Sequence, residues 1–329
     1  MPIMTLPEIS IVVPLYNEEE NVRPLCNAVR EALKEWPRTW ELLLVDDGSR
    51  DHTVDAAAEE AAADPRLRLL GLKRNQGQTM AMATGFAKAR GRIIVSMDGD
   101  LQNDPCDIPM MVSRIDDGFD LVCGWRKQRK DLFLSRRLPS LAANALIAWI
   151  TGVHIHDNGC SLKAYRAAVI QTVRLYSEMH RFLPALVSMT GARITEVVVR
   201  HHPRIHGQSA YGLSRVFRVL GDMIIIKMLT QFSNRPGQWF GLLALPFLVL
   251  ALVLAGVWAG GIWFSSKPVS IIYPSLSVLS MYMFGSLMTS SILSEMLLAK
   301  ADKNYLRDLT SVLAVVKELG PHQARNGKL

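Results

Sequence analysis

The sequence predicts an α/β domain with a mostly parallel sheet, followed by an amphipathic helix on a membrane surface and a hairpin of two transmembrane helices. Three observations support this prediction. Apolar runs alternate with helical patterns over residues 1–213, apolar residues with spaced charges fill residues 214–237, and two later stretches contain no charged residue. With 329 residues, the chain is long enough for two domains, or for one domain and an appendage.

Four short apolar runs are expected to form strands, and they cover residues 8–14, 41–47, 67–72 and 92–98. Helices are expected between them, over residues 18–35, in the Ala- and Glu-rich stretch that follows Ser49, and over residues 77–89. Continuous apolar strands that alternate with helices are typical of a parallel sheet with helices on both faces. A sheet of this kind binds its ligands at the carboxyl ends of its strands.

The two charge-free stretches, residues 239–264 and 271–294, are each long enough to cross a bilayer, which requires about 20 apolar residues. Only the sequence SSKPVS separates them, so residues 238–298 are expected to form a hairpin that returns to its starting side. Trp239, Trp258, Trp263 and Tyr273 lie near the expected membrane interfaces. The alternative is a pair of helices buried in the core of a globular domain.

Lys and Arg residues flank the hairpin on both sides, which by the positive-inside rule places both flanks in the cytoplasm. The expected location is therefore the inner (cytoplasmic) membrane, with the N-terminal domain in the cytoplasm and the lipid bilayer as a partner. The pattern of residues 214–237 fits a helix in the interface plane, with a buried helix of the N-terminal domain as the alternative. The tail, residues 299–329, is largely helical in pattern and is expected to pack or to make contacts in a homo-oligomer.

Several classes of site are excluded because their patterns are missing. The four cysteines show no CxxC spacing, so neither a disulfide framework nor a zinc ribbon is expected. The first ten residues lack the basic and apolar regions of a signal peptide. No GxxxxGKS/T motif occurs and no GxGxxG follows the first strand, which disfavours a P-loop and a Rossmann dinucleotide site. No nucleic-acid partner is expected.

Polar residues lie at the carboxyl end of each of the four predicted strands, at positions 16–18, 46–49, 74–78 and 98–100. One such strand end could be a helix cap, but four at the same edge of a parallel sheet predict a pocket for a ligand with hydroxyls, a base and phosphates. Asp98 and Asp100 do not begin an EF-hand, because Asn103 stands where the loop requires Gly. An Asp-x-Asp pair on a turn suits Mg²⁺ or Mn²⁺, which combine few carboxylates with substrate phosphate oxygens.

Four motifs in this order, VVPLYNEEENV, VDDGSRDHT, RNQGQ and MDGDLQNDP, resemble those of a family 2 glycosyltransferase with the Rossmann-like GT-A fold. Four more narrow the resemblance to the polyprenyl-phosphate glycosyltransferase branch: GWRKQR, SRRLPS, DNGCSLKAYR and HHPRIHGQSAYG. This branch includes the dolichol-phosphate mannose synthases and the bacterial undecaprenyl-phosphate sugar transferases. The resemblance covers about residues 8–236, and the paired C-terminal spans fit the bacterial type.

The resemblance implies roles for the residues at the strand ends. Pro14, Tyr16 and Glu18 would line the nucleotide pocket, and Asp46 would contact the base or the ribose. Asp98 would lie beside the nucleotide. The divalent cation, Mg²⁺ or Mn²⁺, would be held against the diphosphate by the set Asp98, Asp100 and Gln102.

The resemblance also implies a catalytic set and an acceptor site. The catalytic set is Asp100, Asp157 and Arg126, with Arg126 reaching toward phosphate and Asp157 orienting the acceptor or acting as a base. The acceptor phosphate would be bound by Arg136, Ser140, Arg204 and Ser209. Ala210 stands where the family often has Lys, and His206 or Lys163 is a candidate replacement. The alternative for the basic run of residues 127–137 is contact with anionic lipid headgroups.

The implied reaction is the inverting transfer of a hexose-type sugar from a UDP- or GDP-linked donor to a polyprenyl monophosphate. The partners are thus a nucleotide sugar and a polyprenyl phosphate, and the donor sugar stays open. Three alternatives are a processive polysaccharide synthase, a non-catalytic membrane scaffold on a transferase fold, and a transferase for a diacylglycerol or protein acceptor. Gln238-Trp239 is not the QxxRW motif of a processive synthase, and two spans make a poor pore.

Overall fold

The structure is a computed structural model of the chain. It describes residues 6–127, 148, 152–173, 175, 179–203, 227–228, 232, 235–264, 269–300 and 315–319. The chain divides into two compact units. The first contains Met1–Ile226 with Asp308–Leu329, and the second is Lys227–Arg307.

The first unit contains the four predicted strands, β1 (Ile9–Leu15), β2 (Trp40–Asp46), β3 (Leu67–Leu72) and β4 (Ile93–Ser96). The predicted helices between them are also present, as α1 (Glu19–Ala32), α2 (Thr53–Ala63) and α3 (Gln78–Lys88). β1 pairs in parallel with both β2 and β4, and β2 pairs in parallel with β3. The parallel arrangement predicted for this part of the sheet is therefore confirmed.

The complete sheet is mixed, with the strand order β7-β5-β6-β4-β1-β2-β3-β8 among the described residues. Three further strands follow β4 in the chain: β5 (Leu121–Trp125), β6 (Lys163–Arg166) and β7 (Ile194–Val198). β6 runs antiparallel to both β4 and β5, whereas β5 and β7 are parallel. In the tail, where the pattern predicts helix, Val315–Leu319 forms β8 and pairs antiparallel with β3.

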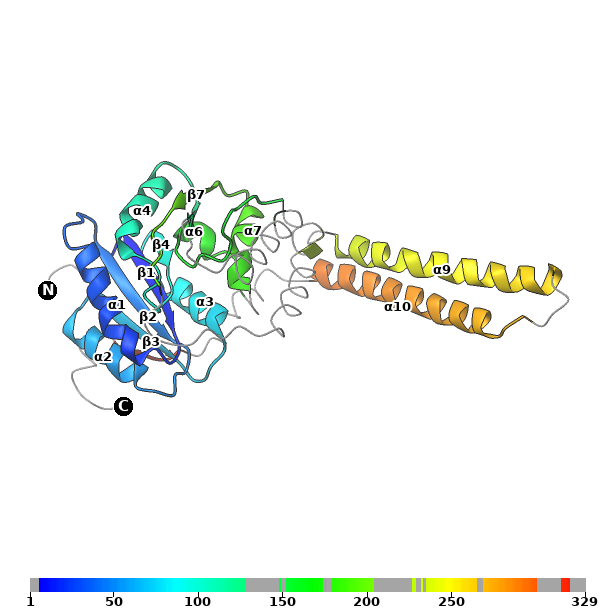
Figure 1. Cartoon of the computed structure of the whole chain (residues 1–329), viewed down its shortest axis with the longest axis horizontal. Coiled ribbons are helices and arrows are strands. Elements are labelled where there is room, and N and C mark those ends of the chain that lie inside the picture. Colours follow the sequence, from blue (N-terminus) through cyan, green and yellow to red (C-terminus); the bar gives the residue numbers. More distant parts are fainter. Residues whose placement is uncertain are drawn as a thin grey trace. The chain divides into compact units, whose positions relative to one another are not determined.

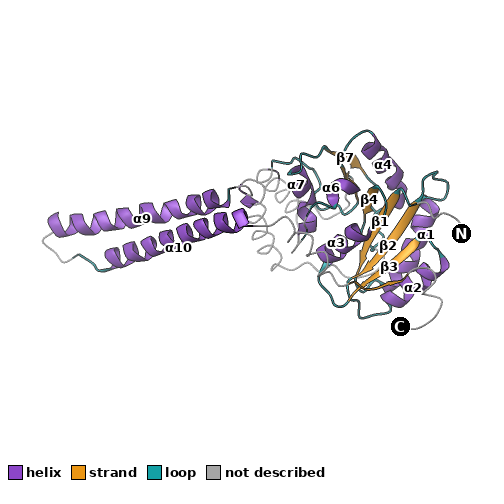
Figure 2. Cartoon of the chain, turned by 180° about the vertical axis from the view of Figure 1, so that it is seen from behind, coloured by secondary structure: helices purple, strands orange, loops and turns teal. Residues whose placement is uncertain are grey.

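Two hydrophobic clusters pack against opposite faces of this sheet (Figures 1 and 2). Ile11 belongs to the cluster that includes α1, α2 and α4 (Ile108–Asp116). Its neighbour Val12 belongs to the cluster with α3, α6 (Ala167–Ile170) and α7 (Leu183–Ser188). Successive strand side chains point to opposite faces, so strands covered on both sides read as continuous apolar runs. Two short 3₁₀ helices, η1 (Pro105–Asp107) and η3 (Met179–Phe182), complete the unit.

A buried carboxylate joins α1, α2 and β3 at the turn after α2. Asp64 accepts hydrogen bonds from Arg30 Nε at 2.9 Å, from Arg66 Nε at 3.0 Å and from Arg66 Nη2 at 2.9 Å. Burial alone would raise the pKa of this carboxyl, but the hydrogen bonds from Arg66 and Arg30 outweigh it and lower the pKa to about 2. The ionised side chain therefore stabilises the folded state above its unfolded pKa, and this contribution disappears as the pH falls toward 2.

The substitution Asp64→Asn is expected to lower the free energy of unfolding by about 2 kcal/mol at pH 7. The measurement is denaturant unfolding of the full chain in detergent, with the exposed substitution Asp117→Asn as the control. The difference between wild type and Asp64→Asn should shrink from pH 5 to pH 3, because Asn does not titrate. A difference that is independent of pH would show that the ion pairs do not contribute as described.

The described part of the second unit is mainly two long helices, α9 (Pro236–Phe264) and α10 (Ile272–Lys300), that lie side by side (Figure 2). Within them, Gly237–Phe264 and Ile272–Leu297 have mean hydropathies of 2.7 and 1.4. At 1.5 Å per residue these segments are about 42 and 39 Å long, which exceeds the roughly 30 Å hydrocarbon core of a bilayer. Both are long and apolar enough to span a membrane, as the sequence predicts.

Small and polar side chains form the contact between α9 and α10. Ala244 and Ala251 are buried, whereas many large apolar side chains of both helices are exposed. Ser277 Oγ donates to the carbonyl of Ala251 at 2.8 Å, and Ser291 Oγ donates to the carbonyl of Gly237 at 2.9 Å. Small residues and interhelical hydrogen bonds are typical of helix pairs in membranes. Most of the amphipathic helix predicted over residues 214–237 lies outside the described residues.

Candidate active site

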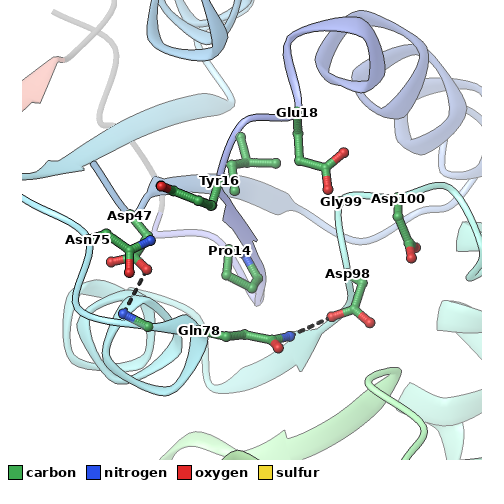
Figure 3. A pocket seen from close by; sticks show the side chains of 11 residues that line it. Pro14, Tyr16, Glu18, Asp47, Asn75, Gln78, Asp98, Gly99 and Asp100 are labelled. Carbon is green, nitrogen blue, oxygen red and sulfur yellow. Dashed lines mark hydrogen bonds between the residues drawn. The ribbon is translucent and has the colours of Figure 1, made fainter. Parts of the chain in front are cut away.

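A cavity of about 290 Å³ opens at the carboxyl edge of the parallel strands β1 to β4 (Figure 3). Every one of the four strand ends contributes a polar side chain to its wall, as the sequence predicts for a pocket at this edge. The lining residues are Pro14, Leu15, Tyr16, Glu18, Asp47, Asn75, Gly77, Gln78, Asp98, Gly99 and Asp100. In Figure 3, Asp47 and Asn75 lie on one side of Pro14, and Asp98 and Asp100 lie on the other.

Two acids at the carboxyl end of β2, Asp46 and Asp47, fix the loops at one end of the cavity. Asp46 is buried and accepts the backbone N–H groups of Gly48 at 3.0 Å and Ser49 at 3.1 Å. Asp47 lines the cavity and accepts the N–H groups of Gln76 and Gly77, both at 2.8 Å. The resemblance implies base or ribose contact for Asp46; in the structure Asp47 is among the residues that line the cavity, and Asp46 is not.

Gly48 is required for this arrangement of loops. Its φ of 69° lies in the left-handed region, and a Cβ atom at this position would come within 2.6 Å of the backbone of Arg74. Only a residue without a side chain allows both the backbone conformation and the close approach. The loop after β2 can therefore lie against the loop after β3, which carries Asn75 into the cavity wall and leads into α3, where Gln78 is the first residue.

The acidic pair after β4 forms the other end of the cavity. Asp98 and Asp100 both line it, and the glycine between them approaches Leu15 so closely that a Cβ would lie 2.6 Å from Leu15 Cδ2. Gln78 Nε2 crosses from α3 to donate to Asp98 Oδ1 at 2.8 Å (Figure 3). Asp100 Oδ1 accepts the backbone N–H of Gln102 at 3.1 Å. The pair is thus held by side-chain and backbone donors on the surface of the cavity.

The electrostatic surroundings of Asp98 are set by burial and by nearby charges. Burial raises the pKa of the Asp98 carboxyl, and the negative charge of Asp100 raises it further. A hydrogen bond from Ser161 and the positive charges of Arg126 and Lys163 oppose this rise in the pKa. A divalent cation between the two carboxylates would remove this repulsion.

Arg126 and Asp157 form a buried ion pair beside the acidic pair. Arg126 Nε donates to Asp157 Oδ2 at 2.7 Å, and Arg126 Nη2 donates to Asp157 Oδ1 at 2.8 Å. The two side chains are only 11% and 7% exposed. Two parallel hydrogen bonds fix the plane of the guanidinium, so the positions of both groups are defined together. The sequence singled out both residues for catalysis, and the structure brings them into direct contact.

Lys163 is buried at the start of β6, opposite Ser96 in the antiparallel pairing with β4. Its ammonium group donates to the carbonyl oxygens of Asn158, at 3.3 Å, and of Cys160. These carbonyls belong to the loop that carries Asp157. These contacts suit a role in holding this loop. They do not support the contact with phosphate that was considered for Lys163 from the sequence.

The remaining predicted site residues fall into two groups. Pro14, Tyr16 and Glu18 lie on the cavity wall together with the acidic pair. Gln102 follows the acidic pair in the chain, and its backbone carbonyl accepts the N–H of His202 at 2.9 Å. Four predicted acceptor residues lie outside the described residues: Arg136, Ser140, Arg204 and Ser209. Asp47, Asn75 and Gln78 also line the cavity, and no individual role was predicted for them, although their position at the ends of predicted strands could have identified them.

The carboxylates of Asp98 and Asp100 fit a divalent cation whose coordination is completed by a bound ligand. Within the described ranges, no group of three His, Cys, Asp or Glu side chains is close enough to hold a metal ion by itself. Asp98 and Asp100 supply carboxylates from a single turn on the wall of an open cavity. Mg²⁺ is commonly held by one or two carboxylates together with substrate phosphates and water, so this pair suits a cation that binds with a phosphorylated ligand.

Comparison with known proteins places this chain in a family. Residues 10–174 match the domain described as glycosyl transferase family 2. The chain is 43% identical to the dodecaprenyl-phosphate galacturonate synthase of Rhizobium johnstonii, over 98% of this chain and 96% of that protein. It is 33% identical to the undecaprenyl-phosphate 4-deoxy-4-formamido-L-arabinose transferase of Pseudomonas aeruginosa, over 84% of each chain.

Solved structures share the fold of the first unit at low sequence identity. The glucosyl-3-phosphoglycerate synthase of Mycobacterium tuberculosis, solved with Mn²⁺, uridine diphosphate and phosphoglyceric acid, matches with a TM-score of 0.52 and 17% identity, over 68% of this chain and 78% of that chain. The mannosyl-3-phosphoglycerate synthase of Rubrobacter xylanophilus matches with a TM-score of 0.54 and 15% identity, over 69% and 75%. These likenesses confirm the GT-A fold that the sequence motifs predict.

Proposed function

Since the chain belongs to glycosyl transferase family 2, we propose that it transfers a hexose-type sugar from a nucleotide diphosphate sugar to a polyprenyl monophosphate, with inversion at the anomeric carbon. The single observation that carries this proposal is the acidic pair, Asp98 and Asp100, on the wall of a cavity built by four strand ends. The choice of acceptor is supported by the names of the two relatives and by the two helices that can span a membrane.

The donor would occupy the cavity at the carboxyl edge of the sheet. Pro14, Tyr16 and Glu18 would contact the nucleoside, Asp47 and Asn75 would bound it at the far end, and the diphosphate would face Asp98 and Asp100. Asp98 and Asp100, with Gln102 behind them, would hold a Mg²⁺ or Mn²⁺ ion. Such an ion, when bound, stabilises the negative charge that develops on the departing nucleoside diphosphate.

The nucleophile would be an oxygen of the polyprenyl phosphate. A bond forms between this oxygen and the anomeric carbon, while the bond from that carbon to the diphosphate breaks and its electron pair leaves with the nucleoside diphosphate. The second pKa of a phosphate monoester is about 6, so the nucleophile is largely ionised at neutral pH without a base. Its negative charge has to be positioned by cations, and a guanidinium can donate from more than one edge.

Arg126 is suited to this positioning role because Asp157 holds only part of its guanidinium. Asp157 accepts from Nε and Nη2, which leaves the direction of Nη1 for a phosphate. We therefore assign Asp157 the task of orienting Arg126, rather than that of a general base. Arg136, Ser140, Arg204 and Ser209 would complete the acceptor site.

The proposed function is tested with the purified full chain in detergent, undecaprenyl phosphate and a panel of labelled UDP- and GDP-linked sugars. UDP-galacturonate is the first member of the panel, because the relative with 43% identity is named for galacturonate transfer. One donor is expected to label the lipid, and EDTA should remove the activity until Mg²⁺ or Mn²⁺ is restored. The proposal fails if no donor labels the lipid while hydrolysis or transfer to another acceptor proceeds.

The substitution Gln78→Glu is expected to raise the KM for the nucleotide sugar about ten-fold, which corresponds to about 1.4 kcal/mol. It replaces the amide that donates to Asp98 with a carboxylate of nearly the same shape, so the hydrogen bond becomes a repulsion beside the predicted diphosphate site. Steady-state kinetics with the active donor provide the measurement. Gln76→Glu adds the same charge two residues away, on a side chain outside the cavity wall, and should leave KM within two-fold. Equal effects of both substitutions would contradict the role of Gln78.

A further inference from the structure

Glu196 lies on β7, an edge strand of the described sheet, opposite Cys123 of β5 in the parallel pairing. The side chains of β7 are mostly half-exposed, yet the Glu196 side chain is only 13% exposed. A carboxylate loses hydration when it is covered in this way, and the loss has to be offset by hydrogen bonds. The partners that supply them belong to the loop that carries Asp157.

Three donors from two consecutive residues converge on the Glu196 carboxylate. Oε1 accepts the backbone N–H of His156 at 2.9 Å and that of Asp157 at 3.4 Å. Oε2 lies 2.7 Å from Nδ1 of His156, and this ring nitrogen must carry a proton because a carboxylate only accepts. Both oxygens are therefore used, and a single side chain restrains the backbone of residues 156 and 157 together with the imidazole ring.

The restrained loop meets the end of β5 through two adjacent pairs. The His156 ring stacks on Trp125 with centroids 4.3 Å apart and an interplanar angle of 17°. The next residues in each segment, Asp157 and Arg126, form the bidentate ion pair. The ring stack and the ion pair thus join the same two dipeptides, and Glu196 fixes one of these dipeptides to the neighbouring strand.

We infer that Glu196 is a positioning residue for the transfer step, because it sets the place of Asp157 and thereby the direction of the Arg126 guanidinium. This inference rests on the proposed function, in which Arg126 meets the acceptor phosphate. Glu196 and His156 do not line the cavity assigned to the donor. Their effect should therefore fall on the acceptor and on the rate of transfer, and binding of the donor should be unaffected.

The chemistry of the three donors explains why a carboxylate is needed at this position. An amide side chain has one acceptor oxygen and no charge, so Glu196→Gln replaces charge-assisted hydrogen bonds with weaker neutral ones, and it keeps the ring contact only if Nδ1 of His156 becomes the acceptor. The isosteric substitution is therefore expected to loosen the loop without leaving a cavity. A displacement of about 1 Å at a reacting group can reduce the rate by up to about a hundred-fold.

The test uses the purified full chain with undecaprenyl phosphate and the donor on which the wild type is active. Glu196→Gln is expected to lower kcat/KM for undecaprenyl phosphate at least about ten-fold, with the KM for the donor within about two-fold. His156→Ala removes the ring contact at an exposed residue and should cause a smaller loss in the same direction. The double variant should lose less than the product of the two single losses, because both substitutions act on the same loop. Val198→Ala, at an exposed position on the same strand, is the matched control and should match the wild type.

Two results would overturn the inference. The first is that the Glu196→Gln and His156→Ala proteins fold and keep the wild-type kcat/KM for the acceptor. The second is that the KM values of the Glu196→Gln protein for donor and acceptor rise equally, which would show a general loss of structure instead of a positioning role. Inactivity of the wild type toward undecaprenyl phosphate with every donor would be a failure of the proposed function. If the wild type is active and only the variants differ from it, the result bears on the role of Glu196 and not on the proposed function.

Discussion

Replacing Asp100 with Asn should reduce sugar transfer about a thousand-fold, which corresponds to about 4 kcal/mol in the activation free energy. The amide is nearly isosteric, but it takes away one of the two carboxylates that face the cavity. The charge on the departing nucleoside diphosphate would then lose much of its stabilisation. The measurement is the initial rate of lipid labelling at saturating donor, over a range of Mn²⁺ concentrations.

This substitution should not unfold the protein. The charge of Asp100 raises the pKa of the Asp98 carboxyl, so its removal relieves a repulsion between the two acids. The thermal unfolding temperature of Asp100→Asn should therefore equal or exceed that of the wild type. Asp55→Asn, on the exposed surface of α2, is the control and should keep full activity. Transfer that is insensitive both to EDTA and to Asp100→Asn would contradict the assigned metal role.

The substitution with the second largest expected effect is Arg126→Ala, which should lower kcat/KM for the polyprenyl phosphate about a hundred-fold or more. It removes the guanidinium proposed for the acceptor phosphate and breaks the buried ion pair between Arg126 and Asp157. Loss of one member of a buried pair also costs stability, typically about 3–5 kcal/mol, so folding has to be measured in parallel. Arg126→Lys keeps the charge but not the two parallel hydrogen bonds, and we expect it to recover only part of the activity.

A matched control exists on the same sheet. Arg166 on β6 donates to Asp120 at 2.9 Å and pairs in register with Ile93, at the end of β4 opposite the cavity. Arg166→Lys therefore changes an Arg–Asp pair without touching the site, and it should leave the kinetics unchanged. If Arg126→Lys is as active as the wild type at all acceptor concentrations, the guanidinium geometry is not used for catalysis.

The first half of the sheet could be predicted from the sequence because its strands are covered on both faces. Ile11 and Val12 pack into different clusters, so the run that contains them is continuously apolar and its pattern is strong. The antiparallel strand β6 could not be predicted in this way. It contains only Lys163–Arg166, begins with a charged residue that is buried by tertiary contacts, and takes its direction from pairing with β4 and β5.

The candidate site shows the same division between local and distant information. The acids at the carboxyl ends of β2 and β4 could be identified because they lie where predicted strands end. The pairs Gln78–Asp98, Arg126–Asp157 and Glu196–His156 join residues 20, 31 and 40 positions apart in the chain. No local sequence pattern encodes such a contact. The different positions of Asp46 and Asp47 relative to the cavity, and the contacts of Glu196, can therefore be seen only in the folded structure.

We propose that this glycosyltransferase places one sugar on a polyprenyl phosphate. The most direct test is mass spectrometry of the lipid formed from undecaprenyl phosphate and the active donor, with the anomeric configuration determined on the same product. We predict a phosphodiester with a single sugar of inverted configuration, formed together with one nucleoside diphosphate. A polymer on the lipid, a retained configuration, or nucleoside diphosphate released without any lipid product would contradict the account.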